Sequence, residues 1–119
     1  MNSMIIIDDE AFFLNSVKTL LNWELFDVDL KAAYTNPADA MEYIKSNHVD
    51  IIMTDIKMPV ISGIDIARYC RYNCPDTKVI FLSGYEDFDY AKQAISYNVY
   101  SYVTKPVSRA TLTKLFYEL

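Results

Sequence analysis

The chain has 119 residues, of which 52% are hydrophobic and 23% are charged, a composition typical of one globular domain with a single core. The net charge of −5 argues against nucleic-acid binding, because a phosphate backbone would be repelled. No apolar run approaches the roughly 18 residues that span a membrane, and acids arrive at Asp8 before a secretory signal could form. We therefore expect no membrane contact and a cytoplasmic location.

Segments typical of strands and helices alternate along the whole chain. The strand runs are continuously apolar, as in strands that are buried on both faces, and the segments between them have apolar residues at helical spacing. In chain order we expect a strand at Met4–Ile7, a helix at Ala11–Trp23, a strand at Val28–Ala33, a helix at Pro37–Asn47, a strand at Ile51–Thr54, a helix at Ile64–Tyr72, a strand at Lys78–Leu82, a helix at Asp87–Tyr97, a strand at Tyr100–Val103 and a helix at Val107–Glu118. This alternation predicts an α/β fold in which a single doubly wound, five-stranded parallel sheet is flanked by five helices.

Reactive polar side chains follow four of the five predicted strands. Asp8 and Asp9 follow the first strand, Asp55 the third, Ser83 the fourth and Lys105 the fifth. Ligands of open parallel sheets bind at the carboxyl ends of the strands. We therefore expect these five side chains to share one edge of the sheet and to form one site.

The chemistry of these side chains favours a cation and a phosphoryl group. Asp8, Asp9 and Asp55 would repel one another unless a cation joined them, and oxygen ligands suit Mg²⁺ or Mn²⁺. Lys105 can neutralise a phosphate oxygen, and Ser83 can donate a hydrogen bond to another. Asp55 can then act as the nucleophile that aspartyl-phosphate chemistry requires.

The single histidine, the two cysteines and the acids after the first strand bear on which kinds of site this chain can form. His48 precedes the third strand, so it is expected at the opposite edge, where it cannot complete a Ser-His-Asp site with these residues. Cys70 and Cys74 have neither redox nor zinc spacing, and we expect two packed or half-packed thiols. Taken alone, the acids from Asp8 to Glu10 could simply match the dipole of a helix N-terminus.

The chain resembles the receiver domain of two-component response regulators along essentially its whole length. The matching segments are Ile7-Asp8-Asp9-Glu10, residues 55–63, Leu82-Ser83-Gly84 and residues 102–106. The resemblance implies a flavodoxin-like fold with strand order 2-1-3-4-5. It also implies a phosphorylation switch whose partner is a sensor histidine kinase, and which catalyses only its own phosphotransfer and dephosphorylation.

Roles in metal and phosphate binding follow from the resemblance by position. Asp55 matches the phosphoacceptor, and Lys105 matches the phosphate-binding lysine. Asp9 matches the direct Mg²⁺ ligand, Asp8 matches its acidic partner, and Lys57 matches the residue whose backbone carbonyl binds the metal.

Roles in the conformational switch follow in the same way. Ser83 matches the switch hydroxyl and Tyr102 the switch aromatic, while Gly63 matches the glycine of the loop after the acceptor. Asn98 stands where many relatives have glycine, and we expect the turn to survive because Asn tolerates the left-handed conformation.

The resemblance also makes predictions about phosphate loss and self-association. Lys57 and Tyr85 match the positions that flank the approach of the hydrolytic water, so we expect a long-lived phosphorylated form. Tyrosines cluster on the predicted fourth helix, fifth strand and fifth helix, at Tyr90, Tyr97, Tyr100, Tyr102 and Tyr117. Either they are core and scattered surface residues, or they form a homodimer face.

The chain also resembles a subgroup of receivers that are fused to an AraC-type helix-turn-helix domain. The matching residues are the segment Ser83–Phe88, Tyr90-Ala91, Trp23 and Phe26. We therefore expect residues 1–119 to be an N-terminal fragment of a longer regulator. A missing C-terminal domain would then contact DNA and control transcription. The alternative is a stand-alone receiver that acts through protein–protein contact.

Two rival functions remain to be compared. A Mg²⁺-dependent aspartyl-phosphate phosphohydrolase typically has a second acid two residues after the nucleophile, where this chain has Lys57. A flavin-binding domain of similar topology needs amide-rich turns for phosphate in its first loop, where this chain has Asp8-Asp9-Glu10. The residues that this chain has at these positions therefore disfavour both rival functions.

Overall fold

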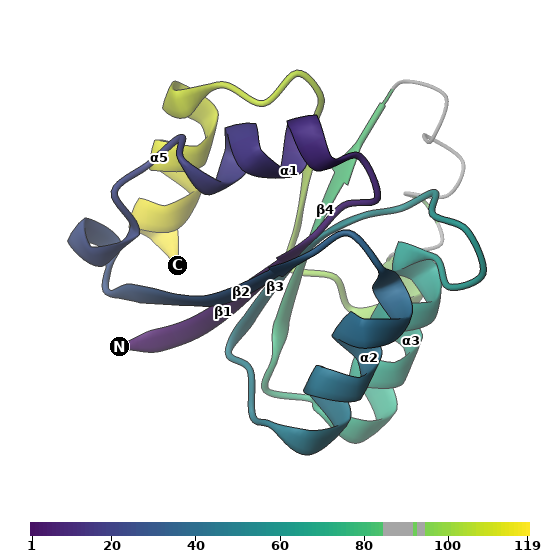
Figure 1. Ribbon diagram of the computed structural model, residues 1–119. Helices are drawn as coiled ribbons and strands as arrows, with labels where there is room; N and C mark the ends of the chain where they lie inside the picture. Colours follow the sequence, from purple (N-terminus) through teal and green to yellow (C-terminus); the bar gives the residue numbers. More distant parts are fainter. Residues whose placement is uncertain (85–91, 93–94) are drawn as a thin grey trace.

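The computed structural model describes residues 1–84, 92 and 95–119 (Figure 1). A five-stranded parallel sheet with the order β2-β1-β3-β4-β5 forms its centre. The strands are β1 (Asn2–Ile7), β2 (Val28–Tyr34), β3 (Ile51–Asp55), β4 (Lys78–Ser83) and β5 (Ser101–Thr104). The predicted flavodoxin-like fold and its strand order are confirmed.

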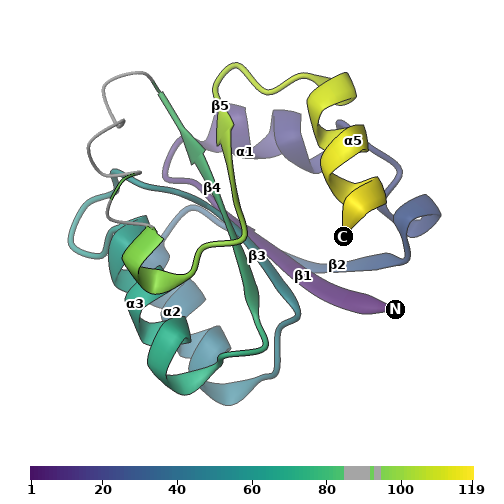
Figure 2. The same cartoon turned by 180° about the vertical axis from the view of Figure 1, so that it is seen from behind.

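Helices cover both faces of the sheet. The α-helices among the described residues are α1 (Ala11–Lys18), α2 (Pro37–Ser46), α3 (Gly63–Asn73) and α5 (Arg109–Glu118). Helices α1 and α5 lie on one face and α2 and α3 on the other, as the two opposite views show (Figures 1 and 2). Most of the helix predicted at Asp87–Tyr97 lies outside the described residues, and its last part forms the 3₁₀ turn η3 (Ile95–Tyr97).

The first helix is shorter than the sequence predicted. It ends at Lys18, and a separate 3₁₀ turn, η1 (Trp23–Phe26), follows. The indole Nε1 of Trp23 donates a hydrogen bond to the Lys18 carbonyl at 2.9 Å, and its ring packs edge-on against Phe116 of α5 at 5.1 Å between centroids. The prediction of one helix from Ala11 to Trp23 was therefore wrong, because Trp23 leaves the helical path to pack against α5.

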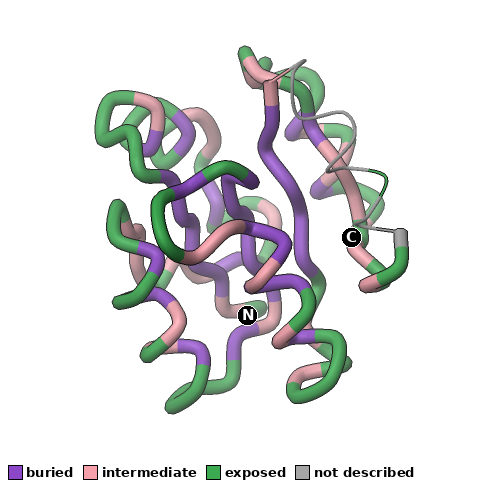
Figure 3. Tube along the Cα trace, turned by 90° about the vertical axis from the view of Figure 1, so that its right-hand side faces the viewer, coloured by how far each residue is buried: buried purple, intermediate pink, exposed green. Residues whose placement is uncertain are grey.

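The core is divided between the two faces of the sheet by the alternation of side chains along each strand. In β1, Met4 and Ile6 join the cluster under α1 and α5, whereas Ile5 and Ile7 join the cluster under α2 and α3. The central strands are buried along almost their whole length (Figure 3). This double burial explains why the strand sequences are continuously apolar.

Local signals in the sequence position the turns. The side chain of Asn36 accepts a hydrogen bond from the Ala38 amide at 2.9 Å and caps α2, which begins at Pro37 as predicted. Asn98 has a φ of 58°, so the left-handed turn expected before β5 is present.

Candidate functional site

Three carboxylates meet at the carboxyl-end edge of the sheet. Asp8 and Asp9 follow β1 and Asp55 ends β3, and these two strands are paired neighbours. One oxygen from each of the three lies within 4.8 Å of the others, with Asp8 and Asp55 buried and Asp9 exposed. Three oxygen donors at this spacing fit a hard divalent cation such as Mg²⁺ or Mn²⁺.

Lys105 brings a positive charge to the same cluster. Its Nζ lies 2.9 Å from Oδ2 of Asp8 and 3.5 Å from Oδ1 of Asp55. The backbone N–H of Lys105 donates to the Ser83 carbonyl at 2.7 Å, which ties the loop after β5 to the end of β4. The lysine therefore enters the site from a fixed backbone position.

The surroundings of Asp55 disfavour its charge. Burial and the neighbouring Asp8 carboxylate raise the pKa of Asp55 to about 6, and Asp9 adds to this effect. Lys105 and the Ile56 N–H, which donates to Oδ1 of Asp55 at 2.8 Å, oppose the rise. A cation bound by these carboxylates would relieve their repulsion, so the charges of this edge favour a positively charged ligand.

Burial lowers the pKa of the Lys105 ammonium, but the hydrogen bond to Asp8 and the charge of Asp55 outweigh burial, and the pKa is raised. The lysine is therefore protonated at neutral pH and can pair with an anionic oxygen.

The Ser83 hydroxyl is the polar group in this region that lacks a partner. Among the residues that the structure describes, Ser83 Oγ is the one buried side-chain oxygen or nitrogen without a hydrogen bond. Leaving a buried hydroxyl unpaired costs about 1–3 kcal/mol. Ser83 ends β4, next to the strand that carries Asp55, so its hydroxyl is available to a ligand bound at this edge.

The loop after Asp55 requires a glycine. A Cβ placed on Gly63 would lie 2.4 Å from the Asp55 carbonyl oxygen and 2.9 Å from the Ile56 Cα. The Gly63 amide donates to the Ile56 carbonyl at 2.7 Å, and Ser62 caps α3 in a reciprocal hydrogen-bond pair with Asp65. The start of α3 thus packs directly against the backbone of Asp55.

The roles predicted for three other site residues are not tested by the structure. Lys57 is exposed in the loop after β3, and the role of its carbonyl remains a prediction. Tyr102 is half-buried against the cluster under α2 and α3, and its switch role also remains a prediction. Tyr85 lies outside the described residues.

One contact in the site was missed by the sequence analysis. The ring of Phe13, in α1, lies under the Lys105 ammonium, with Nζ 4.2 Å from the ring centroid. In the sequence, Phe13 is one apolar residue of the helix predicted at Ala11–Trp23, with no sign in its residue type of a role in the site. The available signal was its place in the first turn after Asp8 and Asp9, at the edge where the functional residues meet.

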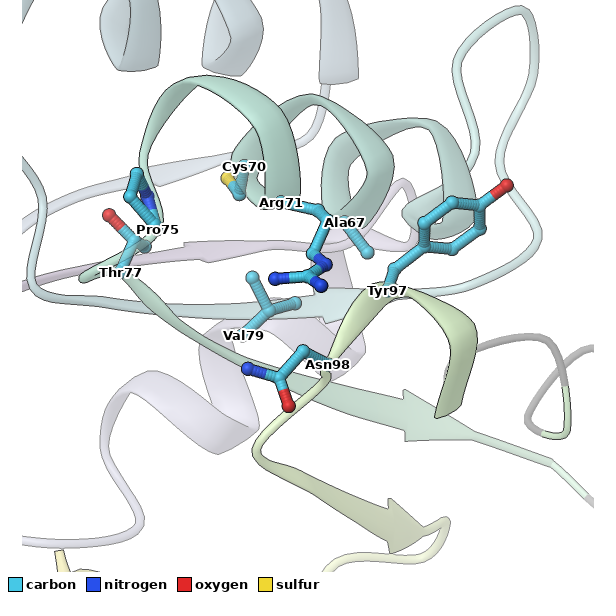
Figure 4. Close-up of a pocket in the computed structure, with 8 residues that line it drawn as sticks. All are labelled: Ala67, Cys70, Arg71, Pro75, Thr77, Val79, Tyr97 and Asn98. Carbon is cyan, nitrogen blue, oxygen red and sulfur yellow. The ribbon is translucent and has the colours of Figure 1, made fainter.

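The cysteines and the histidine lie away from this site. Cys70 is buried and Cys74 half-buried, and neither forms a disulfide, as expected. Burial raises the pKa of Cys70 to about 12, with a contribution from Cys74, which disfavours the thiolate form that reacts. Cys70 lines a small pocket between α3, β4 and η3 (Figure 4). His48 precedes β3 at the opposite edge, as predicted.

Within residues 1–84, 92 and 95–119, no helix has the length and apolar character needed to cross a bilayer.

Comparisons with known proteins agree with this geometry. The sequence model of the response regulator receiver domain family matches residues 4–117. The chain is 29% identical over 119 residues to the uncharacterized transcriptional regulatory protein YesN of Bacillus subtilis. It is 32% identical over 114 residues to the transcriptional regulatory protein HptR of Staphylococcus aureus. These alignments cover 100% and 94% of this chain but only 32% and 44% of the relatives, so the chain spans less than half of their length.

Solved structures share the fold over the whole chain. The REC domain of AraT, a response regulator from Geobacillus stearothermophilus, has a TM-score of 0.92 and 28% identity, with 98% of this chain and 90% of that chain covered. A two-component transcriptional regulator AraC from Clostridium phytofermentans has a TM-score of 0.89 and 26% identity, with 99% and 92% covered.

Proposed function

The chain belongs to the response regulator receiver domain family, and on this premise we propose that it is a phosphorylation-dependent switch with Asp55 as the phosphoacceptor. A sensor histidine kinase is the proposed donor. The main support is the position of Asp55: it is buried at a strand end, 3.5 Å from the Lys105 ammonium and clustered with Asp8 and Asp9.

The proposed transfer uses the residues of the acidic edge in separate roles. A carboxylate oxygen of Asp55 attacks phosphorus while the bond from phosphorus to the donor's histidine nitrogen breaks. Lys105 pairs with a phosphoryl oxygen, and Ser83 Oγ donates a hydrogen bond to another. Asp8, Asp9, Asp55 and the Lys57 carbonyl would hold Mg²⁺, which would supply charge neutralisation at the phosphoryl oxygens.

The direct test is phosphorylation by acetyl phosphate with Mg²⁺, followed by intact-mass measurement. We expect one phosphoryl group on the wild type and none on Asp55→Asn. Asp76→Asn, which changes an exposed aspartate outside the cluster, is the matched control and should be modified like the wild type. Undiminished phosphorylation of Asp55→Asn would refute the assignment.

We propose that phosphorylation acts on the surface around β5 and α5. Ser83 would move towards the phosphoryl oxygens, and Tyr102 would turn inward into the space that Ser83 leaves. The hydrogen bond from Ser83 differs between the two states, as a ligand-driven shift requires. A homodimer would then form through this surface, and sedimentation with and without beryllofluoride would test that step; the predicted fourth helix, which also belongs to the proposed dimer face, lies mostly outside the described residues.

The proposed output is transcription, through a C-terminal DNA-binding domain of the AraC type in a longer cytoplasmic protein. Support comes from relatives that are named transcriptional regulators and are more than twice as long as this chain. The alternative output is protein–protein contact by the receiver alone. Sequencing the reading frame downstream of Leu119 separates the two.

We also propose that the phosphorylated form is long-lived. Lys57 and Tyr85 stand at the two positions that flank the approach of water in this family, and neither is an acid or amide that would orient water. Rates of phosphate release from Lys57→Asn and Tyr85→Glu test this proposal. Release no faster than from the wild type would contradict it.

A further inference from the structure

We propose that Phe13 is a positioning residue for Lys105, and that the face of its ring holds the lysine ammonium in the phosphoryl site. This inference rests on the proposed function of Asp55 and adds a residue to the same site. It starts from the contact between the ring and Nζ, which links the first turns of α1 to the loop after β5.

The geometry is that of a cation–π contact. The Lys105 Nζ lies 4.2 Å from the centroid of the Phe13 ring, well within the distance of about 6 Å at which such contacts operate. The side chain of Lys105 is only 21% exposed, which limits the screening of the contact by water. The preceding residue provides a comparison, since Phe12 is 88% exposed.

A ring is suited to this position because it holds a cation without carrying a net charge. Among the described residues, the other partners of Nζ are the carboxylates of Asp8 and Asp55, and both belong to the cluster that can bind a metal ion. A third carboxylate beside Lys105 would repel the incoming phosphoryl group and compete for the ammonium. The quadrupole of the ring attracts the ammonium and does neither.

The contribution of the ring should therefore be largest when the carboxylates are engaged by a cation. Their attraction for Lys105 is then shared with the metal, whereas the attraction of the ring is unchanged. Without the ring, the flexible four-carbon chain of the lysine could turn outward to water, and fewer molecules would present Nζ to the phosphoryl oxygens.

The simpler explanation is that Phe13 only fills space, since it also packs against the cluster under α1 and α5. Phe13→Leu separates the two explanations, because it retains an apolar side chain and removes the π face. Phe13→Tyr keeps the aromatic face and serves as the rescue variant. Phe12→Leu makes the same chemical change one residue away, at an exposed position, and serves as the control.

The first measurement is the rate of phosphorylation by acetyl phosphate at saturating Mg²⁺. We expect Phe13→Leu to be slower by about 2- to 30-fold, the range that corresponds to a cation–π contact. Phe13→Tyr and Phe12→Leu should stay within about twofold of the wild type. A wild-type rate in Phe13→Leu, or a Phe13→Tyr variant as slow as Phe13→Leu, would overturn the inference.

The second measurement does not depend on phosphorylation. The ε-methylene protons of Lys105 should show an upfield ring-current shift in the NMR spectrum of the wild type and of Phe13→Tyr, and the shift should disappear in Phe13→Leu or, if that variant does not fold, in Phe13→Met. An unchanged shift would contradict the contact itself. Failure of the wild type to be phosphorylated at Asp55 would instead refute the proposed function, so the two failures are distinguishable.

Discussion

Two aspartates flank the central strand β3, and their surroundings have opposite effects on them. At its amino end, Oδ2 of Asp50 accepts a hydrogen bond from the Ser3 amide at 2.8 Å, and Oδ1 lies 2.8 Å from His48 Nε2. The hydrogen bond from the Ser3 backbone, with help from His48, holds the pKa of Asp50 below its usual value. At the carboxyl end, burial and Asp8 raise the pKa of Asp55 to about 6.

Two serines show the same contrast. Ser3 Oγ donates to Asp50 at 3.2 Å and accepts from the Asp50 amide at 3.1 Å, whereas Ser83 Oγ is buried without a partner among the described residues. The amino-end edge satisfies its own polar groups and joins β1 to β3. The carboxyl-end edge crowds three carboxylates together and leaves the Ser83 hydroxyl without a partner among the described residues, so part of the stability of the fold is given up for a ligand.

The largest effect should come from breaking the amino-end edge. Asp50→Asn loses the charge-assisted hydrogen bonds and should lower the free energy of unfolding at pH 7 by about 1–3 kcal/mol. Urea unfolding followed by Trp23 fluorescence measures this change. Asp76→Asn, at an exposed position, should stay within about 0.5 kcal/mol. Equal values for the two variants would show that the Asp50 network does not contribute to stability.

Replacing the aspartate at the carboxyl end of β3 by asparagine should change the free energy of unfolding in the opposite direction. In metal-free buffer at pH 7, Asp55→Asn should raise the free energy of unfolding by roughly 1–2 kcal/mol, because it removes a disfavoured charge.

The effect of Asp55 should also depend on pH. Its pKa is higher in the folded chain, about 6, than in the unfolded chain. Its stabilising contribution is therefore complete below the unfolded pKa of about 3.9 and is lost as the pH rises through about 6. The advantage of Asp55→Asn should grow over this interval, and an advantage that is independent of pH would contradict the assignment. Asp50, with its lowered pKa, should show the opposite pH dependence: its contribution to stability is lost on acidification.

A smaller effect should follow from Mg²⁺. A few carboxylates on loops give a weak, hydrated site, so we expect affinity in the millimolar range. At tenfold excess over the dissociation constant, Mg²⁺ should add about 1.4 kcal/mol to the stability of the wild type. Asp9→Ala should lose this gain, whereas Glu10→Ala, which changes an exposed neighbouring acid outside the cluster, should keep it. A full gain in Asp9→Ala would exclude Asp9 as a ligand.

The smallest effect should come from the unpartnered serine. Ser83→Ala removes a hydroxyl without a hydrogen bond, and the relief of its burial cost is opposed by the lost packing of the oxygen atom, so stability should change by less than about 0.5 kcal/mol, or rise slightly. Ser3→Ala breaks the contacts to Asp50 and should cost about 1 kcal/mol. Thermal unfolding of the two variants compares them directly, and a larger loss in Ser83→Ala would mean that the Ser83 hydroxyl is satisfied in the folded chain.

The sequence predicted the carboxyl-end edge well because strand ends and residue types are local properties. The apolar runs located the strands, and the parallel arrangement then brought Asp8, Asp9 and Asp55 together with Lys105. The end of the first helix was predicted wrongly because Trp23 is held by Phe116, which lies far away in the sequence.

The features that the sequence did not predict are contacts between distant segments. The Asp50 network depends on the register of β1 against β3, and the position of Phe13 under Lys105 depends on how α1 meets the loop after β5. The raised pKa of Asp55 likewise depends on burial and on distances to its neighbours.

The most direct test of the contrast between the two edges is to titrate the side-chain carboxyl carbons of both aspartates by ¹³C NMR in metal-free buffer, with Asp50→Asn and Asp55→Asn used to assign the signals. We expect Asp55 to titrate near pH 6 and Asp50 below its usual value. A midpoint for Asp55 at or below that of Asp50 would contradict the account, because the carboxyl-end edge would then hold no disfavoured charge for a ligand to relieve.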